Sequence, residues 1–173
     1  WASLGTTLKY VVFTVPVGLF LSILIASLLN AKIKGKSIYR TLYFLPSVTM
    51  SAAVAMVWKW MYNEQMGILN SAIRAVGGKG HNWMTDSHTA LFGIMIVGLW
   101  MTVGYNMIIL LAGMQGISKS YYEAAQIDGA TSLQTLFKVK IPMVMPSITI
   151  CLFLTVSNSF KLFDQNLALT AGA

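Results

Sequence analysis

The chain has 173 residues, of which 56% are hydrophobic and 10% are charged. Soluble domains carry about 25% charged residues, so the composition excludes an ordinary water-soluble domain and predicts an all-α, polytopic transmembrane helix bundle in a lipid bilayer. The net charge is +7. Seven of the twelve cations lie in two connecting segments, as the positive-inside rule predicts for cytoplasmic loops, so we expect no nucleic-acid partner.

Four stretches lack Asp, Glu, Lys and Arg and are about 18 residues or longer, enough to cross the hydrocarbon core as a helix. They predict membrane spans at about residues 6–30, 41–62, 89–114 and 141–160. Because lipid gives no hydrophobic drive for helix association, the spans should pack through small residues. The candidates are Gly18, Ser22, Ala26, Gly93, Gly98, Gly104 and Gly113.

The first span contains Pro16, which should kink or loosen the helix locally. The segment "AKIKGKSIYR", residues 31–40, follows it with four cations and no anion. This charge bias places the segment in the cytoplasm. The second span should then end on the outer side, with Trp58, Trp60 and Tyr62 forming an interfacial aromatic belt.

Residues 63–88 are expected to form the external loop, because two acidic residues balance two basic ones. Within it "ILNSAIRAV", residues 68–76, has apolar residues at helical spacing and could lie flat on the membrane surface. His81 and His88 lack a recognisable metal-ligand spacing. The single cysteine, Cys151, lies in the fourth span and cannot form a disulfide within the chain. We therefore expect no metal site.

The segment between the third and fourth spans, about residues 115–141, contains two predicted short helices. Ser120 and Glu123 have the spacing of a capping box. Ala124 and Ala125 would leave a smooth face that another protein can approach closely. Gly129 can adopt the left-handed conformation that ends a helix.

A second helix is predicted directly after this glycine. Thr131 or Ser132 can cap it, and Leu133, Leu136 and Phe137 would share its apolar side before Pro142 opens the next span. Two such helices could dock a partner protein, or they could rest their apolar sides on lipid.

The sequence "EAAQIDGATSLQTLFKVKIP", residues 123–142, resembles the EAA loop of ABC-importer permeases. The matching residues are Glu123, Ala124, Ala125, Gly129, Val139, Ile141 and Pro142. Ser118 replaces the proline that often stands in the lead-in to this loop. Most of the chain resembles the first-permease type of carbohydrate importers, the maltose and glycerol-phosphate group, through "KIKGKSIYRTLYFLP", "MGILN", "NWMTD", "LAGMQGISKSYYEAA" and "SFKLFDQNLALTAG".

This resemblance implies that residues 1–173 are a single permease domain that is incomplete at both ends. The spans would be the second to fifth of a six-helix core. Residues 123–129, Asp128 included, would form a coupling helix seated on an ATP-binding cassette subunit, and Phe137 would also take part in this coupling. The resemblance also implies a second permease subunit, an extracellular or periplasmic sugar-binding protein and a place in the bacterial cytoplasmic membrane.

The sequence has no phosphate-binding G-x-x-x-x-G-K-[ST] motif. We therefore expect no cofactor and no enzymatic activity of the chain itself, with ATP and Mg²⁺ bound by the partner subunit. Glu123 would either contact that subunit or serve only its own capping box. The alternative function is a channel or another membrane transport subunit without ATP coupling, and the EAA-like loop argues for the permease.

Polar residues inside the spans are candidates for the sugar path, because neutral sugars stack on aromatic rings and hydrogen-bond to hydroxyl and amide groups. Thr102 and Tyr105 share a helical face in the third span, and Thr155, Asn158 and Ser159 do so in the fourth. Asn106 is a weaker candidate on a different face. The alternative role for such residues is hydrogen bonding between helices.

Overall fold

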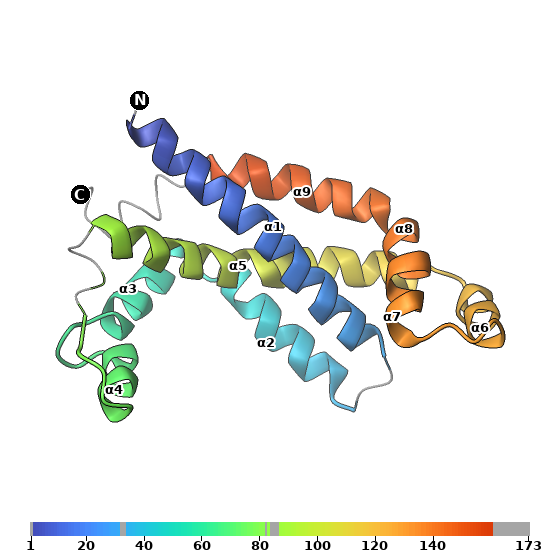
Figure 1. Cartoon of the computed structure of the whole chain (residues 1–173), viewed down its shortest axis with the longest axis horizontal. Helices are drawn as coiled ribbons and strands as arrows, with labels where there is room; N and C mark the ends of the chain where they lie inside the picture. The colour runs from blue at the N-terminus through green and yellow to red at the C-terminus, as the bar shows by residue number, and fades with distance from the viewer. Residues whose placement is uncertain (1, 32–33, 82, 84–86, 161–173) are drawn as a thin grey trace. The chain divides into compact units, whose positions relative to one another are not determined.

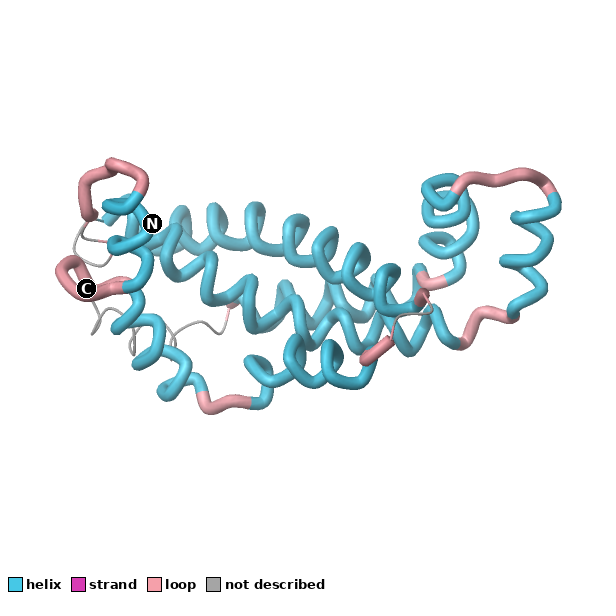
Figure 2. Tube along the Cα trace, turned by 90° about the horizontal axis from the view of Figure 1, so that it is seen from below, coloured by secondary structure: helices cyan, strands magenta, loops and turns pink. Residues whose placement is uncertain are grey.

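The computed structural model describes residues 2–31, 34–81, 83 and 87–160. Within these ranges the chain forms helices, turns and loops, and no strand (Figures 1 and 2). In chain order the helices are α1 Ala2–Asn30, α2 Lys36–Val48, α3 Ser51–Met61, α4 Ile68–Ala75, α5 Ser87–Gln115, α6 Lys119–Ile127, α7 Ser132–Thr135, the π-helix η1 Leu136–Lys140, α8 Ile141–Met143 and α9 Met145–Ser159.

Two helices are long and apolar enough to cross a membrane unbroken. They are Gly5–Asn30, within α1, and Thr89–Gln115, within α5. These two helices confirm the first and third predicted spans. Helix α1 continues through Pro16 without a break. The described chain has up to four spans if each of two interrupted helix pairs is taken as one span.

The second predicted span is interrupted, which corrects the expectation of one helix over 41–62. Helix α2 ends at Val48 and α3 begins at Ser51. Met50 is the N-cap residue of α3, and its ψ of 129° is not helical. Pro46 lies within α2, where it cannot donate a backbone hydrogen bond to the preceding turn.

The fourth predicted span is also interrupted, because α8 ends at Met143 and α9 begins at Met145. The helical stretches Ser132–Met143 and Met145–Ser159 meet at an angle of 72°. Pro146 lies in the first turn of α9, where its missing N–H would have had no helical partner. The chain therefore bends where a proline begins a new helix.

The chain divides into two compact units, and each long helix contributes to both. Among the described residues, the first unit comprises those within 2–14, 48–100 and 157–160, and the second comprises those within 15–47 and 101–156. They are described separately below.

In the first unit, an aromatic cluster surrounds the outer end of α3. The rings of Trp58 and Tyr62 lie 5.3 Å apart, and those of Trp58 and Trp100 lie 5.6 Å apart. The Tyr62 hydroxyl donates to the carbonyl oxygen of Gly93 at 3.0 Å. Tyr62 is buried whereas Trp60 is exposed. The predicted aromatic belt is therefore wrong for Tyr62, which packs inside the protein.

The loop of the first unit that is predicted to be external is organised by the buried side chain of Asn70, which lies in α4. This helix confirms the amphipathic helix predicted over 68–76. The side-chain amide group of Asn70 forms hydrogen bonds with loop residues that precede α4 and with loop residues that follow it. Its Nδ2 donates to the carbonyl oxygens of Asn63, Glu64 and His81 at 2.8–3.3 Å, and its Oδ1 accepts from the His81 backbone N–H at 3.0 Å and from Trp83 Nε1 at 3.1 Å.

In the second unit, small residues bring helices close together, as the sequence predicts. Ser22 and Ala26 are fully buried, and Ser22 Oγ lies 3.3 Å from the carbonyl oxygen of Val103 in α5. A Cβ atom on Gly104 would overlap the backbone carbonyl group of Tyr43 in α2. The backbones of α2 and α5 can meet there only because residue 104 has no side chain.

This contact predicts a large effect of Gly104→Ala. The added methyl group would meet backbone atoms, so the helices must separate, at a cost of about 1–3 kcal/mol. Gly93→Ala is the matched control, since its Cβ would lie 3.5 Å from the Tyr62 ring, an ordinary contact. Thermal unfolding of the full-length protein in detergent measures both variants. Equal stability of the two variants would contradict the close approach.

Candidate functional site

The helix α6 begins earlier than the sequence suggests. Its N-cap residue is Ser118, with a ψ of 140°, and no side chain caps the helix. Ser118 Oγ and Ser120 Oγ lie 2.9 Å apart. The predicted capping box of Ser120 and Glu123 is wrong, because Ser120 lies inside the first turn, where its backbone is helical. Glu123 is exposed on α6 and does not cap this helix.

The end of α6 forms a complete Schellman motif, as expected from Gly129. This glycine has a φ of +70°, and no atom lies within 4 Å of the position of an added Cβ. The N–H of Gly129 donates to Gln126 at 3.0 Å, and that of Ala130 donates to Ala125 at 2.9 Å. The left-handed backbone, and not lack of space, therefore accounts for the glycine.

The second short helix begins with a capping box, so Thr131 is the cap and Ser132 is the first helical residue. Gln134 N–H donates to Thr131 Oγ1 at 3.3 Å, and Thr131 N–H donates to Gln134 Oε1 at 2.8 Å. Helix α7 then passes into the π-helix η1 at Leu136. The chain from Ser118 to Lys140 is thus a folded element in which the end of α6 and the start of α7 are capped, and we call it the cytoplasmic element after its predicted location.

The outer surface of the cytoplasmic element is partly apolar. Ile127, Leu133 and Phe137 are exposed. Ala124 is exposed on α6, but Ala125 is only 7% exposed. The predicted smooth face therefore includes Ala124 and not Ala125, whose side chain packs inward.

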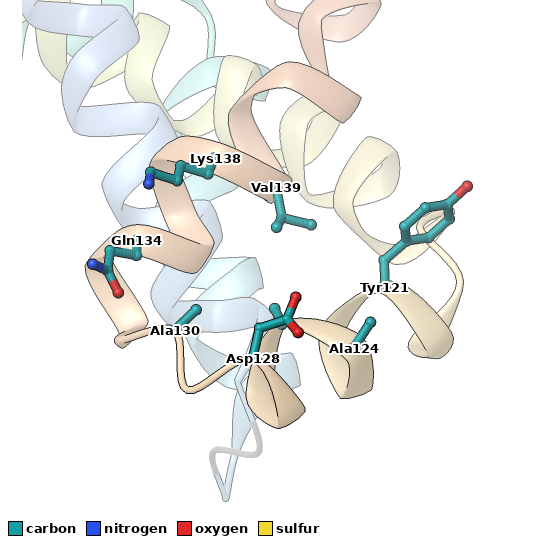
Figure 3. Close-up of a pocket in the computed structure, with 8 residues that line it drawn as sticks. Tyr121, Ala124, Asp128, Ala130, Gln134, Lys138 and Val139 are labelled. Atoms are coloured by element: carbon teal, nitrogen blue, oxygen red, sulfur yellow. The ribbon is translucent and has the colours of Figure 1, made fainter.

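A pocket of about 470 Å³ lies between α6 and the helices that follow it (Figure 3). Small side chains of α6 line one side, and Gln134, Lys138 and Val139 line the other. Asp128, at the C-cap of α6, places a carboxylate at this pocket. The full lining consists of Tyr121, Ala124, Ala125, Asp128, Ala130, Gln134, Lys138 and Val139.

The polar residues of the third and fourth spans separate into two groups by burial. Thr155 and Ser159 are buried, and Asn106 Nδ2 donates to Thr155 Oγ1 at 2.8 Å. Asn106 and Thr155 therefore join α5 to α9, which is the packing role left open by the sequence. Tyr105 and Asn158 are exposed and Thr102 is half-buried, so these three side chains stay accessible candidates for a solute path.

Three polar residues of interest were missed by the sequence reasoning. Asn70 stands in the matched motif "MGILN", but nothing in its spacing shows that it folds a loop. Tyr122 contacts Met114 in α5, and Lys140 contacts Ser27 in α1. A signal existed for Lys140, because a cation at the edge of an apolar run needs a polar partner.

The helices and the cytoplasmic element define the class of protein, an all-helical integral membrane protein with a folded connection between its third and fourth predicted spans. The chain belongs to the family of binding-protein-dependent transport system inner membrane components, which it matches over residues 18–173. This match confirms the predicted permease family. Most of the motifs "NWMTD" and "SFKLFDQNLALTAG" lies outside the described residues.

Curated relatives include sugar-transport permeases. The chain is 35% identical over 173 residues to the probable starch degradation products transport system permease protein AmyD of Thermoanaerobacterium thermosulfurigenes, covering 100% of this chain and 59% of that protein. It is 34% identical over 175 residues to the lactose transport system permease protein LacF of Rhizobium radiobacter, covering 99% and 58%. The chain thus spans less than two thirds of the length of these relatives.

A solved structure shares the fold. It is the crystal structure of a bacterial alginate ABC transporter in complex with an alginate pentasaccharide-bound periplasmic protein. The TM-score is 0.86 at 21% sequence identity, over 96% of this chain and 58% of the matched chain. This likeness confirms the predicted all-α permease fold.

The contact between Asn106 and Thr155 predicts that Thr155→Val destabilises the protein. Hydrogen bonds between membrane helices contribute about 0.6 kcal/mol on average and at most about 1.7 kcal/mol, so the free energy of unfolding of the full-length protein should fall within that range. Thr149→Val, at an exposed position of α9, is the matched control. A larger loss from Thr149→Val than from Thr155→Val would contradict the assignment.

Proposed function

We propose that this chain is the membrane-spanning part of a permease subunit in an ATP-driven carbohydrate importer. The observation that carries the proposal is the cytoplasmic element, a folded unit between two spans in a chain of this family. Two curated relatives of the chain are described as permease proteins of transport systems for starch degradation products and for lactose. Their names support a carbohydrate as the solute.

In this proposal α6 is the coupling helix and contacts a separate ATP-binding cassette subunit, which binds ATP and Mg²⁺. Because Glu123 has no capping role, contact with that subunit is the better of the two roles considered for its exposed carboxylate. The caps at the end of α6 and at the start of α7 favour movement of the two helices as one body. ATP-driven closure of the partner would then displace the helices attached to the element and alternate access to the solute.

The proposed assembly contains a second permease subunit and an external solute-binding protein. The family description refers to a binding protein, and the solved structure contains a periplasmic one. The cation-rich segments support a cytoplasmic location for the element. We propose the bacterial cytoplasmic membrane as the location.

Tyr105 is the strongest candidate for the sugar path in this chain. Its ring is exposed on α5 and can stack on the apolar face of a sugar. Thr102 lies three residues earlier on the same helix and offers a hydroxyl group. Asn158 remains a candidate on α9, whereas the burial of Thr155 and Ser159 favours a packing role for both.

The coupling proposal predicts that Glu123→Lys releases the ATP-binding subunit. In the full-length complex, reversing a charge at an interface costs several kcal/mol when it opposes like charge. The amount of ATPase that co-purifies should therefore fall by at least about tenfold. Gln65→Lys, on the external loop, adds positive charge elsewhere and should retain the ATPase.

Two results would contradict the proposal. One is normal retention of the ATPase and normal transport by Glu123→Lys. The other is a wild-type protein that carries solute without ATP and never co-purifies with an ATPase, which would indicate a channel or another transport subunit without ATP coupling.

A further inference from the structure

Three side chains from distant parts of the sequence meet at the cytoplasmic end of the second unit. They are Ser27 in the last turn of α1, Tyr122 in α6 and Lys140 at the end of η1, and we call them the cytoplasmic bracket. Lys140 Nζ donates to Ser27 Oγ at 3.2 Å, and it lies 5.8 Å from the centre of the Tyr122 ring. The bracket therefore ties the cytoplasmic element to α1.

The contact of Lys140 with Ser27 brings a cation to the end of α1, while burial lowers the pKa of the Lys140 ammonium group. The C-terminal turn of a helix carries partial negative charge and unpaired carbonyl groups. The last turn of α1 contains no basic residue of its own. Lys140, 113 positions later in the sequence, supplies a cation there. Its half-buried stem also packs against neighbouring side chains, as long cationic residues commonly do.

Tyr122 extends the bracket to α5. Its hydroxyl donates to the carbonyl oxygen of Met114 at 3.5 Å, a long hydrogen bond to the last turn of α5. Burial raises the pKa of Tyr122, and a hydrogen bond with the side chain of Asn30 partly opposes this rise. The side chain of Tyr122 thus forms hydrogen bonds with the ends of α1 and α5, and its ring lies near the Lys140 cation.

The lysine that contacts α1 is the last residue of a π-helix. The element η1 spans Leu136–Lys140, where the backbone departs from α-helical register. Lys138, two residues earlier, is exposed and lines the pocket between α6 and the helices that follow it. Lys140 points inward to Ser27. Single π turns often occur where a functional side chain must be redirected.

We propose that the cytoplasmic bracket is the joint through which displacement of the coupling helix reaches α1. The inference rests on the proposed function, and it adds a route that the chain connectivity does not supply. The cytoplasmic element is covalently joined to α5 and to α9, so those helices follow it directly. Helix α1 follows α6 only through non-covalent contacts, and the bracket provides a cation, a ring and a hydroxyl group for this purpose.

A purely structural role for Lys140 would be to cap α1. Removal of such a cap lowers stability but leaves the number of solute molecules transported per ATP unchanged. A joint behaves differently, because its loss lets the ATPase cycle while α1 fails to follow. The ratio of transport to hydrolysis therefore separates the two roles.

The experiment uses the full-length permease with its partner subunits in proteoliposomes. Lys140→Met keeps the stem of the side chain and removes the charge. It should leave the ATPase bound and active but lower the transport-to-hydrolysis ratio by about two- to thirty-fold, the range for residues that couple two sites. Lys34→Met, which removes an exposed cation of the loop after α1, is the matched control and should keep the wild-type ratio.

A double-mutant cycle tests the contact itself. Ser27→Ala should also lower the ratio, and combining it with Lys140→Met should add little, because both remove the same contact. A wild-type ratio in Lys140→Met overturns the inference while leaving the proposed function intact. If Lys140→Met does not assemble, Tyr122→Phe decides by the same ratio. If the wild-type permease itself does not bind an ATPase, the proposed function is overturned instead.

Discussion

A bilayer core contains no water, so each backbone N–H and C=O group inside it must find a partner within the protein. The described chain meets this requirement with helices, and each interruption carries a cap, a bend or a side-chain hydrogen bond. Gly129 ends α6 in a Schellman motif, and Thr131 starts α7 with a capping box. The interruptions can therefore be rigid and specific in shape, and the proposed function depends on the interruption between α5 and α9.

The hydrogen bonds that join α6 to α7 make the cytoplasmic element suitable as a mechanical part. A flexible loop would absorb a displacement of the ATPase, whereas two helices with a hydrogen-bonded junction can pass it on. The same reasoning applies to the packing of the spans. Gly104 allows α5 to meet α2 backbone to backbone, and Asn106 bonds to Thr155 across α5 and α9. Small residues and single hydrogen bonds replace the hydrophobic drive that lipid cannot supply.

The fold class and two membrane spans could be predicted from hydropathy and charge. The role of Gly129 in ending α6 could be predicted from its position after Asp128 and from its conformational freedom. The interruption near Met50 could not be found this way, because apolar residues continue through it. Ser120 was chosen as a cap from local spacing, but the chain after α5 enters the next helix at Ser118. Ala125 and Thr155 look available in the sequence, and only the packing shows that both are buried. Burial in a membrane protein depends on which helices become neighbours.

Contact between α6 and an ATP-binding subunit is the central claim, and site-directed crosslinking tests it directly. Ile127 is 85% exposed on α6 and Val76 is 87% exposed on the external loop, so a cysteine at either position can react, while Cys151 is buried. In the full-length complex, Ile127→Cys should crosslink to the ATP-binding subunit and Val76→Cys should not. Crosslinking from Val76, or none from Ile127 when the ATPase is present, would contradict the account.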